Sequence, residues 1–561
     1  MFMNIKKEIE ELLKDSLNKI KIDFDGEINL DHPQDLKNGD FTTNIAMVLA
    51  GKESKNPREV AQEILNSLEE SQNIEKVEIA GPGYLNFFLS KSFYLDNLNQ
   101  DLKIDFGKKE KILFEHSSPN LFKPFHIGHM VNNSIGESLS RILEFSGNKV
   151  INVSFPSDVS PGIAKTIWAL KERKINIETL SLQEIADAYV FGTGKYEENK
   201  EEIDKINIQV YNQEECDNLE IYKKGKELSL KHFQEITDKL GSSFEDIIYE
   251  SEAEKVGKKI VKDNIGKIFV ESQGAVIFEG SKYGLFDNVF INSQDFGTYL
   301  TKDIGLLKIK SEKWGNIDKS LVITDVEQKQ HFDLVKKSSS LISEIKDFSK
   351  KSIYLQHGRM SFSGNIKISS RYGNVPLAIE MIEIVQKNIL EKMKNRDFSD
   401  DEKKEISEKL AIATLKYSIL KVTSGKNITF DIEKDTNPQG DTATFLLYTY
   451  VRTESIFRKN DIDLDFVAFS EDSRNGDVPE LEKMLYRFNE IIEKSMEDYS
   501  PHHLAKYLYD LAQKFNSLYE TINFSDKNNE DFNYNLAILK VFGKTMKKGL
   551  NLLGIETVEK M

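Results

Sequence analysis

Cysteine is almost absent from this chain of 561 residues, since Cys216 is the only one. A single thiol excludes a disulfide within the chain and any metal centre built from several thiolates. Long apolar runs are also missing, and without a window of about 18 apolar residues we expect no membrane span. The sequence therefore predicts a cytoplasmic protein with no membrane partner and no bound metal.

The N-terminus lacks the unbroken apolar stretch of a secretory signal. Ile5, Ile9, Leu13 and Leu17 recur at helical spacing with charged residues between them. This pattern predicts an amphipathic helix.

Positive charge is in short supply, because the formal net charge is −16. Such a balance argues against non-specific binding of nucleic acid, and we expect no DNA partner. It does not exclude a specific nucleic-acid site, because only local charge meets the phosphates. Residues 501–561 nearly balance their charges, with eight Lys against seven acidic residues.

The chain is long enough for several domains. Residues 1–105 combine helices with strands at 77–80 and 84–89, which predicts a small α/β domain. Residues 106–375 alternate strands with helices and predict a parallel α/β sheet, interrupted by a helical insertion at about 161–262. Strand signals in this part return at 268–270, 275–278, 289–291 and 321–323. From residue 376 to 561 the strand signals stop, and we expect an all-α domain.

The most informative stretch is 111–147, KILFEHSSPNLFKPFHIGHMVNNSIGESLSRILEFSG. An apolar strand is followed by a polar loop and a helix that opens on HIGH, and a second strand follows at 150–153. A strand, helix and strand in this order form a parallel crossover unit. Ligands of such units gather at the carboxyl ends of the strands and the N-terminus of the helix.

His126 and His129 fall at that helix N-terminus, three residues apart and therefore on one face. Free amide N–H groups and the helix dipole favour an anion there, and Gly128 lets a flat ligand approach the backbone. The pattern predicts a polyphosphate site. A second phosphate element is predicted at GNIKISSRYG, residues 364–373, where Lys367 and Arg371 are cations four residues apart.

The pair HIGH and KISSR resembles the two signatures of the class I aminoacyl-tRNA synthetases. The wider context EHSSPNLFKPFHIGH is similar to the arginyl-tRNA synthetases in particular, as are GTYLTKD at 297–303, DVEQKQH at 325–331 and FLLYTYVR at 445–452. The likeness also covers NGDFTTNIAM at 38–47 and AGPGYLNFFLS at 80–90.

The resemblance implies an α/β Rossmann-like parallel-sheet catalytic domain at 106–375, a small α/β tRNA-contacting domain at 1–105 and an all-α anticodon-binding domain at 376–561. It also implies a ligase that activates arginine with ATP to arginyl-adenylate and transfers it to the 3′ end of tRNA(Arg). ATP would be a substrate and Mg²⁺ would accompany it, with no permanently bound cofactor. A monomer is expected, and so is a need for bound tRNA before arginine is activated.

The resemblance also implies site residues. His126, His129, Lys123 and Lys367 would act in catalysis, with Lys123 replacing the second lysine of the KMSKS signature, whose place is held by Ser370. The ATP site would comprise Ser118, Pro119, His126, Gly128, His129, Lys367, Ser369 and Arg371. The arginine site would comprise Glu115, Asn120, Glu250, Tyr299, Asp303 and Gln328. Contacts to tRNA are expected from Tyr448, Arg452, Arg458 and Lys548, and most aromatic residues of the helical domain are expected in its core.

The chain departs from the family pattern in three places. A GDWG-like motif followed by Gln is replaced by FPSDVSP at 155–161, the TRD triplet is TKD at 301–303, and KISSR is a loose match. Two alternatives therefore stay open at this stage. One is a class I synthetase for another amino acid, and the other is a catalytically silent relative that binds RNA.

Overall fold

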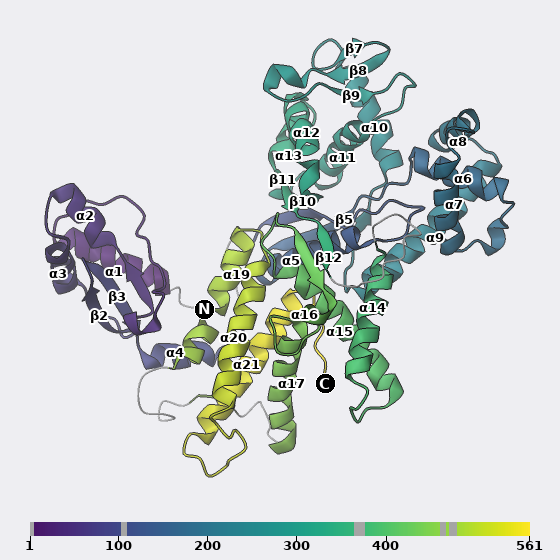
Figure 1. Cartoon of the computed structure of the whole chain (residues 1–561). Coiled ribbons are helices and arrows are strands. Elements are labelled where there is room, and N and C mark those ends of the chain that lie inside the picture. The colour runs from purple at the N-terminus through teal and green to yellow at the C-terminus, as the bar shows by residue number, and fades with distance from the viewer. Residues whose placement is uncertain (1–4, 103–108, 364–375, 461–466, 470–478) are drawn as a thin grey trace. The chain divides into compact units, whose positions relative to one another are not determined.

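The computed structural model describes residues 5–102, 109–363, 376–460, 467–469 and 479–561. The chain folds into two compact units (Figure 1). Unit 1 comprises 1–104, 449–491 and 507–547, and unit 2 comprises 105–448, 492–506 and 548–561. None of the helices in the described ranges is long and apolar enough to cross a membrane.

The first part of unit 1 is a three-stranded antiparallel sheet, in the order β1-β3-β2, with helices packed on it. The predicted amphipathic helix is α1, which buries Ile5, Ile9 and Leu13 in the core of this part. Strand β1 was not expected from the sequence, because it is only three residues long. The elements are α1 (Ile5–Lys19), η1 (Leu36–Asn38), β1 (Phe41–Thr43), α2 (Ile45–Glu53), α3 (Pro57–Ser67), β2 (Ile74–Ala80), β3 (Tyr84–Leu89) and α4 (Lys91–Leu98).

The C-terminal helices predicted from the sequence are present, and parts of them complete unit 1. Their aromatic side chains are largely core, as expected: Phe515 is fully buried, and buried Tyr507 donates its hydroxyl to Met484 O at 3.0 Å. The helices are α17 (Ala443–Asn460), α18 (Glu480–Tyr486), α19 (Phe488–Glu497), α20 (His502–Tyr519) and α21 (Phe532–Leu552).

Unit 2 is built on a five-stranded parallel sheet in the order β11-β10-β4-β5-β6, which agrees with the predicted parallel α/β sheet. Leu113 and Phe114 of β4 are fully buried, as strands covered on both faces should be. The strands are β4 (Lys111–Glu115), β5 (Lys149–Ser154), β6 (Asp246–Ile247), β10 (Lys319–Asp325) and β11 (Ser352–His357).

Helices fill the intervals between these strands. The predicted insertion at about 161–262 contains α6 (Pro161–Glu172), η2 (Ile177–Thr179), α7 (Leu182–Gly194), α8 (Lys200–Asn212), α9 (Asp217–Lys239) and nearly all of α10. It also contains β6, which belongs to the parallel sheet, so the helical insertion is interrupted by a core strand. The other helices of unit 2 are α5 (Ile127–Phe145), α10 (Glu250–Asp263), η3 (Gly280–Tyr283), α11 (Tyr299–Trp314), η4 (Val326–Gln328), α12 (Lys329–Leu341), α13 (Lys346–Lys350), α14 (Ala378–Lys392), α15 (Asp400–Leu420) and α16 (Ile432–Asp435).

Three predicted strands do not belong to the parallel sheet. β7 (Val270–Ser272), β8 (Ala275–Phe278) and β9 (Asn288–Ile291) form a separate antiparallel sheet, at the other end of α10 and α11 from β10 and β11 (Figure 1). The expectation of one sheet was therefore wrong. The reason is the two-residue turn Gln273-Gly274, in which both residues have positive φ, because such a turn joins antiparallel strands only.

The expectation of no strand beyond residue 376 was also wrong. β13 (Ile428–Asp431) pairs in parallel with β12 (Met360–Ser363), a strand that the sequence did not reveal. Both strands are four residues long, and Phe430 is fully buried. Strands this short are too brief for their alternation to stand out from the background.

The C-terminal half of helix α5 and helix α15 are both held to the end of the chain by polar contacts within unit 2. Ser138 donates to Leu552 O at 3.0 Å, and Arg141 donates to Asn551 O at 3.0 Å. Buried Lys416 on α15 donates to Gly554 O at 2.6 Å. These contacts fix the helix whose first turn carries the HIGH sequence.

Candidate active site

The two histidines of HIGH form a stacked pair at the start of α5. His126 is the N-cap residue, and its Nδ1 accepts a hydrogen bond from Gly128 N at 3.1 Å. His129 Nδ1 accepts from His126 N at 3.3 Å, and the ring centroids are 3.7 Å apart. Two of the amide groups that the sequence offered to an anion are therefore already bonded to the rings.

Both rings are neutral near pH 7. Burial, helped by the Lys123 ammonium, lowers the pKa of His126 to about 4. Burial also holds the pKa of His129 well below its usual value, as do His126 and Lys123. Because each Nδ1 accepts an N–H, each neutral ring carries its proton on Nε2. The pair thus presents two Nε2–H donors.

Gly128 is required by the same geometry. A Cβ atom at this position would lie 3.0 Å from Cε1 of the His126 ring. A larger residue would press on the His126 ring, whose Nδ1 accepts the hydrogen bond from Gly128 N. The space beside Gly128 is taken by the His126 ring, and the predicted approach of a ligand there stays a prediction.

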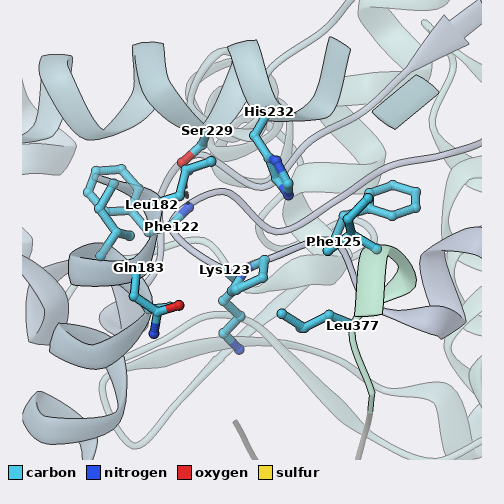
Figure 2. Close-up of a pocket in the computed structure, with 12 residues that line it drawn as sticks. Phe122, Lys123, Phe125, Leu182, Gln183, Ser229, His232 and Leu377 are labelled. Atoms are coloured by element: carbon cyan, nitrogen blue, oxygen red, sulfur yellow. Dashed lines mark hydrogen bonds between the residues drawn. The ribbon is translucent and has the colours of Figure 1, made fainter. Parts of the chain in front are cut away.

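Lys123 lies just before HIGH, with its ammonium 4.4 Å from the centre of the Tyr189 ring. It also lines a cavity of about 100 Å³ next to the HIGH turn (Figure 2). Figure 2 shows Gln183 of α7, His232 of α9 and Leu377 around this space, whose walls are mostly carbon. The cavity contains none of the predicted arginine-binding residues.

The loop between β4 and α5 pairs with the atypical 155–161 segment. Ser118 Oγ accepts from Phe155 N at 3.0 Å, and Pro119 O accepts from Ser157 N at 2.9 Å. Asn120 forms the backbone bridge with Ser157 and leaves its side chain half-exposed. The polar loop thus remains ordered without the GDWG-like motif of the family.

Asp158 explains how the atypical segment is held. It is completely buried; its Oδ2 accepts from Lys226 Nζ at 2.7 Å and Tyr222 Oη at 3.1 Å, and Ser251 bonds both oxygens. With its oxygens satisfied in this way, Asp158 braces the wall of the site.

A group of acids stands at the carboxyl edge of the sheet. Glu115 ends β4 and forms a buried ion pair with Lys310 of α11. Asp303 of α11 accepts a hydrogen bond from His331 Nε2 at 2.5 Å. Burial, together with the Asp303 and Glu115 carboxylates, raises the pKa of Tyr354. Tyr354 therefore stays a neutral phenol close to both acids.

Three other predicted arginine-site residues have different surroundings. Tyr299 is 58% exposed at the start of α11, so its ring is open to a ligand. Glu250 is buried and receives Lys302 Nζ at 2.5 Å and Ser157 Oγ at 2.8 Å. Gln328 is exposed, and its Oε1 caps the short helix η4 by accepting from Asp325 N at 3.1 Å.

Sequence reasoning gave no role to Lys302, Lys310, His331 or Tyr354. Lys302 was noted only as the departure in the TRD triplet, and what singles out these residues in the structure is a partner far away in the chain. Lys310 is 195 residues from Glu115, for example. For His331 a signal was available, since it ends the DVEQKQH stretch.

The KISSR element lies outside the described residues, and with it Lys367, Ser369, Ser370 and Arg371. The four residues predicted to contact tRNA are divided between the two units. In unit 1, Arg452 donates to Asn516 Oδ1 at 2.8 Å and Arg458 donates to Ser455 Oγ at 3.4 Å. In unit 2, Tyr448 is half-buried and the Lys548 ammonium lies 4.9 Å from the Phe145 ring centre.

Comparison with known proteins covers the whole chain. Family models match at residues 7–89 (arginyl tRNA synthetase N terminal domain), 94–432 (tRNA synthetases class I (R), catalytic domain) and 446–561 (DALR anticodon binding domain). The arginine–tRNA ligases of Shewanella halifaxensis and Shewanella pealeana are each 31% identical over 99% of this chain and 100% of their own. The chain belongs to the arginyl-tRNA synthetase family.

Solved arginyl-tRNA synthetase structures share the fold. The Thermus thermophilus enzyme aligns with a TM-score of 0.81 at 21% identity, over 99% of this chain and 100% of that one. The Plasmodium falciparum enzyme aligns with a TM-score of 0.82 at 21% identity over the full length of both chains. The predicted family, fold class and enzyme class, an aminoacyl-tRNA ligase that uses ATP, are thus confirmed.

Proposed function

We propose that this arginyl-tRNA synthetase activates arginine at the carboxyl edge of the β11-β10-β4-β5-β6 sheet. The arginine carboxylate would attack the α-phosphate of ATP in line, releasing pyrophosphate. A carboxylate is already a nucleophile, so the protein needs no general base and works by positioning and by stabilising charge on the phosphates. The arginyl group then passes to the 3′ end of tRNA(Arg).

The observation that carries this proposal is the HIGH turn. Both Nδ1 atoms accept backbone N–H groups, which holds the two neutral rings in place and leaves their Nε2–H groups as the donors for phosphate oxygens. Neutral donors bind phosphate oxygens through hydrogen bonds alone. Positive charge must come from elsewhere: Lys123 beside the turn, Lys367 and Arg371 downstream, and the Mg²⁺ that arrives with ATP. Ser118, Pro119, Gly128 and Ser369 would complete the nucleotide site.

Arginine recognition would rest on the acids of α10 and α11. A planar guanidinium needs carboxylates that accept two parallel hydrogen bonds. Asp303 and Glu250 supply the carboxylates, and the exposed ring of Tyr299 covers the side chain. Glu115, Asn120 and Gln328 would hold the α-ammonium and carboxylate end.

The remaining assignments follow the family. We place the domain boundaries near residues 105 and 376, with 1–105 contacting the elbow of tRNA and 376–561 its anticodon stem and loop. Tyr448, Arg452, Arg458 and Lys548 would contribute to that contact. The enzyme would act as a monomer in the cytoplasm.

ATP–pyrophosphate exchange tests this proposal. With arginine and tRNA(Arg) present, we expect exchange in the wild type and a loss of about 10²–10³-fold in rate for His129→Ala, because a preorganised donor to the phosphates is removed. His232→Ala is the matched control, since His232 lines the neighbouring cavity, and its effect should stay below about 5-fold. Without tRNA the exchange should be near zero, and brisk exchange in its absence would contradict that part of the proposal.

A further inference from the structure

Lys302 forms a buried ion pair inside the proposed arginine site. Its side chain is 4% exposed and that of Glu250 is 8% exposed. The ammonium donates to Glu250 Oε2 at 2.5 Å and to Val159 O at 3.1 Å. Lys302 adjoins Asp303 in the sequence and lies 5.0 Å from the Tyr299 ring centre. A cation is therefore built into a site that must accept a cationic substrate.

Both hydrogen bonds to the Glu250 carboxylate end on the same oxygen, Oε2. Ser157 Oγ donates to the same oxygen, Oε2, at 2.8 Å. The other oxygen, Oε1, accepts no hydrogen bond from any residue that the structure describes. Since Ser157 and Val159 both belong to the atypical 155–161 segment, that segment and Lys302 together fix the orientation of the carboxylate.

We propose that Lys302 is a positioning residue for arginine recognition, which holds Glu250 by Oε2 and keeps it ionised so that Oε1 is presented to the substrate guanidinium. This inference rests on the proposed function. It gives a role to a residue that stands where the family pattern has arginine.

The electrostatics of the site support this role. Burial raises the pKa of Glu250, the Asp303 carboxylate adds to the rise, and Lys302 and Ser157 oppose it. The other titratable groups around the pair are Tyr211 of α8, Tyr299 of α11 and Glu254 of α10. Although burial disfavours its charge, the Glu250 carboxylate and Tyr211 raise the pKa of Lys302. Lys302 thus stays charged, and it is the cation that, together with the Ser157 hydroxyl, opposes protonation of Glu250.

The test is steady-state aminoacylation with Lys302→Met and Lys302→Arg. Lys302→Met should raise the KM for arginine by about 30-fold or more, with kcat and the KM for ATP changed by less than about 3-fold, because a charged contact to substrate is weakened. Lys302→Arg keeps the charge and should recover most of the affinity. An unchanged KM for arginine in Lys302→Met would overturn the inference.

The pH profile separates this role from simple structural support. In Lys302→Met, the KM for arginine should rise as the pH is lowered, because burial raises the pKa of an unpaired carboxyl and Glu250 then takes up a proton more readily. The wild type should show no such rise. Lys226→Met is the control, since it breaks the other ammonium–carboxylate pair of the same segment, at Asp158, without touching Glu250. The same pH profile in Lys226→Met would contradict the inference.

A double variant, Glu250→Gln with Lys302→Met, leaves no buried charge unpaired and guards against failure of Lys302→Met to fold. It should have a raised KM for arginine that does not depend on pH, which assigns the titrating group to Glu250. A wild-type KM in the double variant would overturn the inference. If the wild type itself does not charge tRNA with arginine, it is the proposed function that is contradicted and not the role of Lys302 alone.

Discussion

At the scale of single residues, burial keeps the HIGH histidines neutral, and we propose that they act as hydrogen-bond donors to phosphate. An unfolded histidine titrates near 6.5. In the folded chain the pKa of His126 is lowered to about 4, so between these values the folded state binds fewer protons than the unfolded state. Stability from this group is therefore complete above about pH 6.5 and is lost as the pH falls towards 4.

NMR of the chain labelled at histidine Cε1 measures this directly. We expect the His126 resonance, assigned with His126→Gln, to titrate with a midpoint near 4 and no inflection between about pH 6 and 7. A midpoint near 6.5 would show that the ring is charged over part of the working range, and the neutral-donor account would have to be abandoned.

Asp303 is the residue that best explains a preference for arginine. Asp303→Asn should lower kcat/KM for arginine by about 100-fold or more, because a charge-assisted contact to the guanidinium becomes a neutral one, while the KM for ATP changes by less than about 3-fold. The control is Asp295→Asn, an exposed carboxylate paired with Lys258 and Lys262. Equal losses in the two variants would remove Asp303 from the arginine site.

Whether a site residue can be predicted from the sequence depends on how many residues separate it from its interaction partner. HIGH could be found from the sequence, because its cap, ring stack and helix start lie within four consecutive residues. Asp303 and Tyr299 were found only through the resemblance. The Lys302–Glu250 pair spans 52 residues, and no local pattern marks a buried ion pair of that kind. The pair can be recognised only from the structure, in which α10 and α11 pack together.

At the scale of elements, α10 and α11 form the frame of the proposed arginine site. Their backbones approach closely at two glycines: a Cβ at Gly257 would lie 1.9 Å from Thr301 O, and one at Gly305 would lie 1.8 Å from Ala253 O. Only glycine fits at either position. The close contact fixes Glu250 on one helix against Lys302 and Asp303 on the other.

Gly305→Ala tests this frame. We expect a loss of about 1–3 kcal/mol in the free energy of unfolding from overpacking, together with a raised KM for arginine. Gly194→Ala in α7 is the matched control, since no atom lies within 4 Å of its added Cβ, and it should leave stability unchanged or raise it slightly. Denaturant unfolding and aminoacylation kinetics of both variants provide the measurement, and a fully stable Gly305→Ala enzyme would contradict the close packing.

The elements themselves were predictable where their periodicity was long. The helices of the C-terminal part and the strand–helix–strand unit around HIGH follow the predicted pattern, because amphipathic helices and buried strands leave clear repeats. Strands β7, β8 and β9 were predicted as part of the parallel sheet, because the sequence of a strand does not reveal which strand it pairs with. Strands β12 and β13 were missed because four residues are too few for a pattern.

At the scale of the whole molecule, an acidic chain has to bind tRNA, a polyanion. The net charge of −16 means that long-range attraction does not help, so affinity must come from local contacts on a few basic side chains. The chain matches the three domain models of an arginyl-tRNA synthetase over nearly its entire length. The chain departs from the family pattern at 155–161. In the structure this segment is held by the contacts of Asp158 and by the Lys302–Glu250 pair.

The most direct test of this account is aminoacylation of tRNA with labelled arginine, run beside labelled lysine and glutamine. We predict that the wild-type chain charges tRNA(Arg) with arginine only, and that Asp303→Asn selectively loses this activity. Charging with lysine or glutamine in place of arginine, or binding of tRNA with no charging at all, would contradict it.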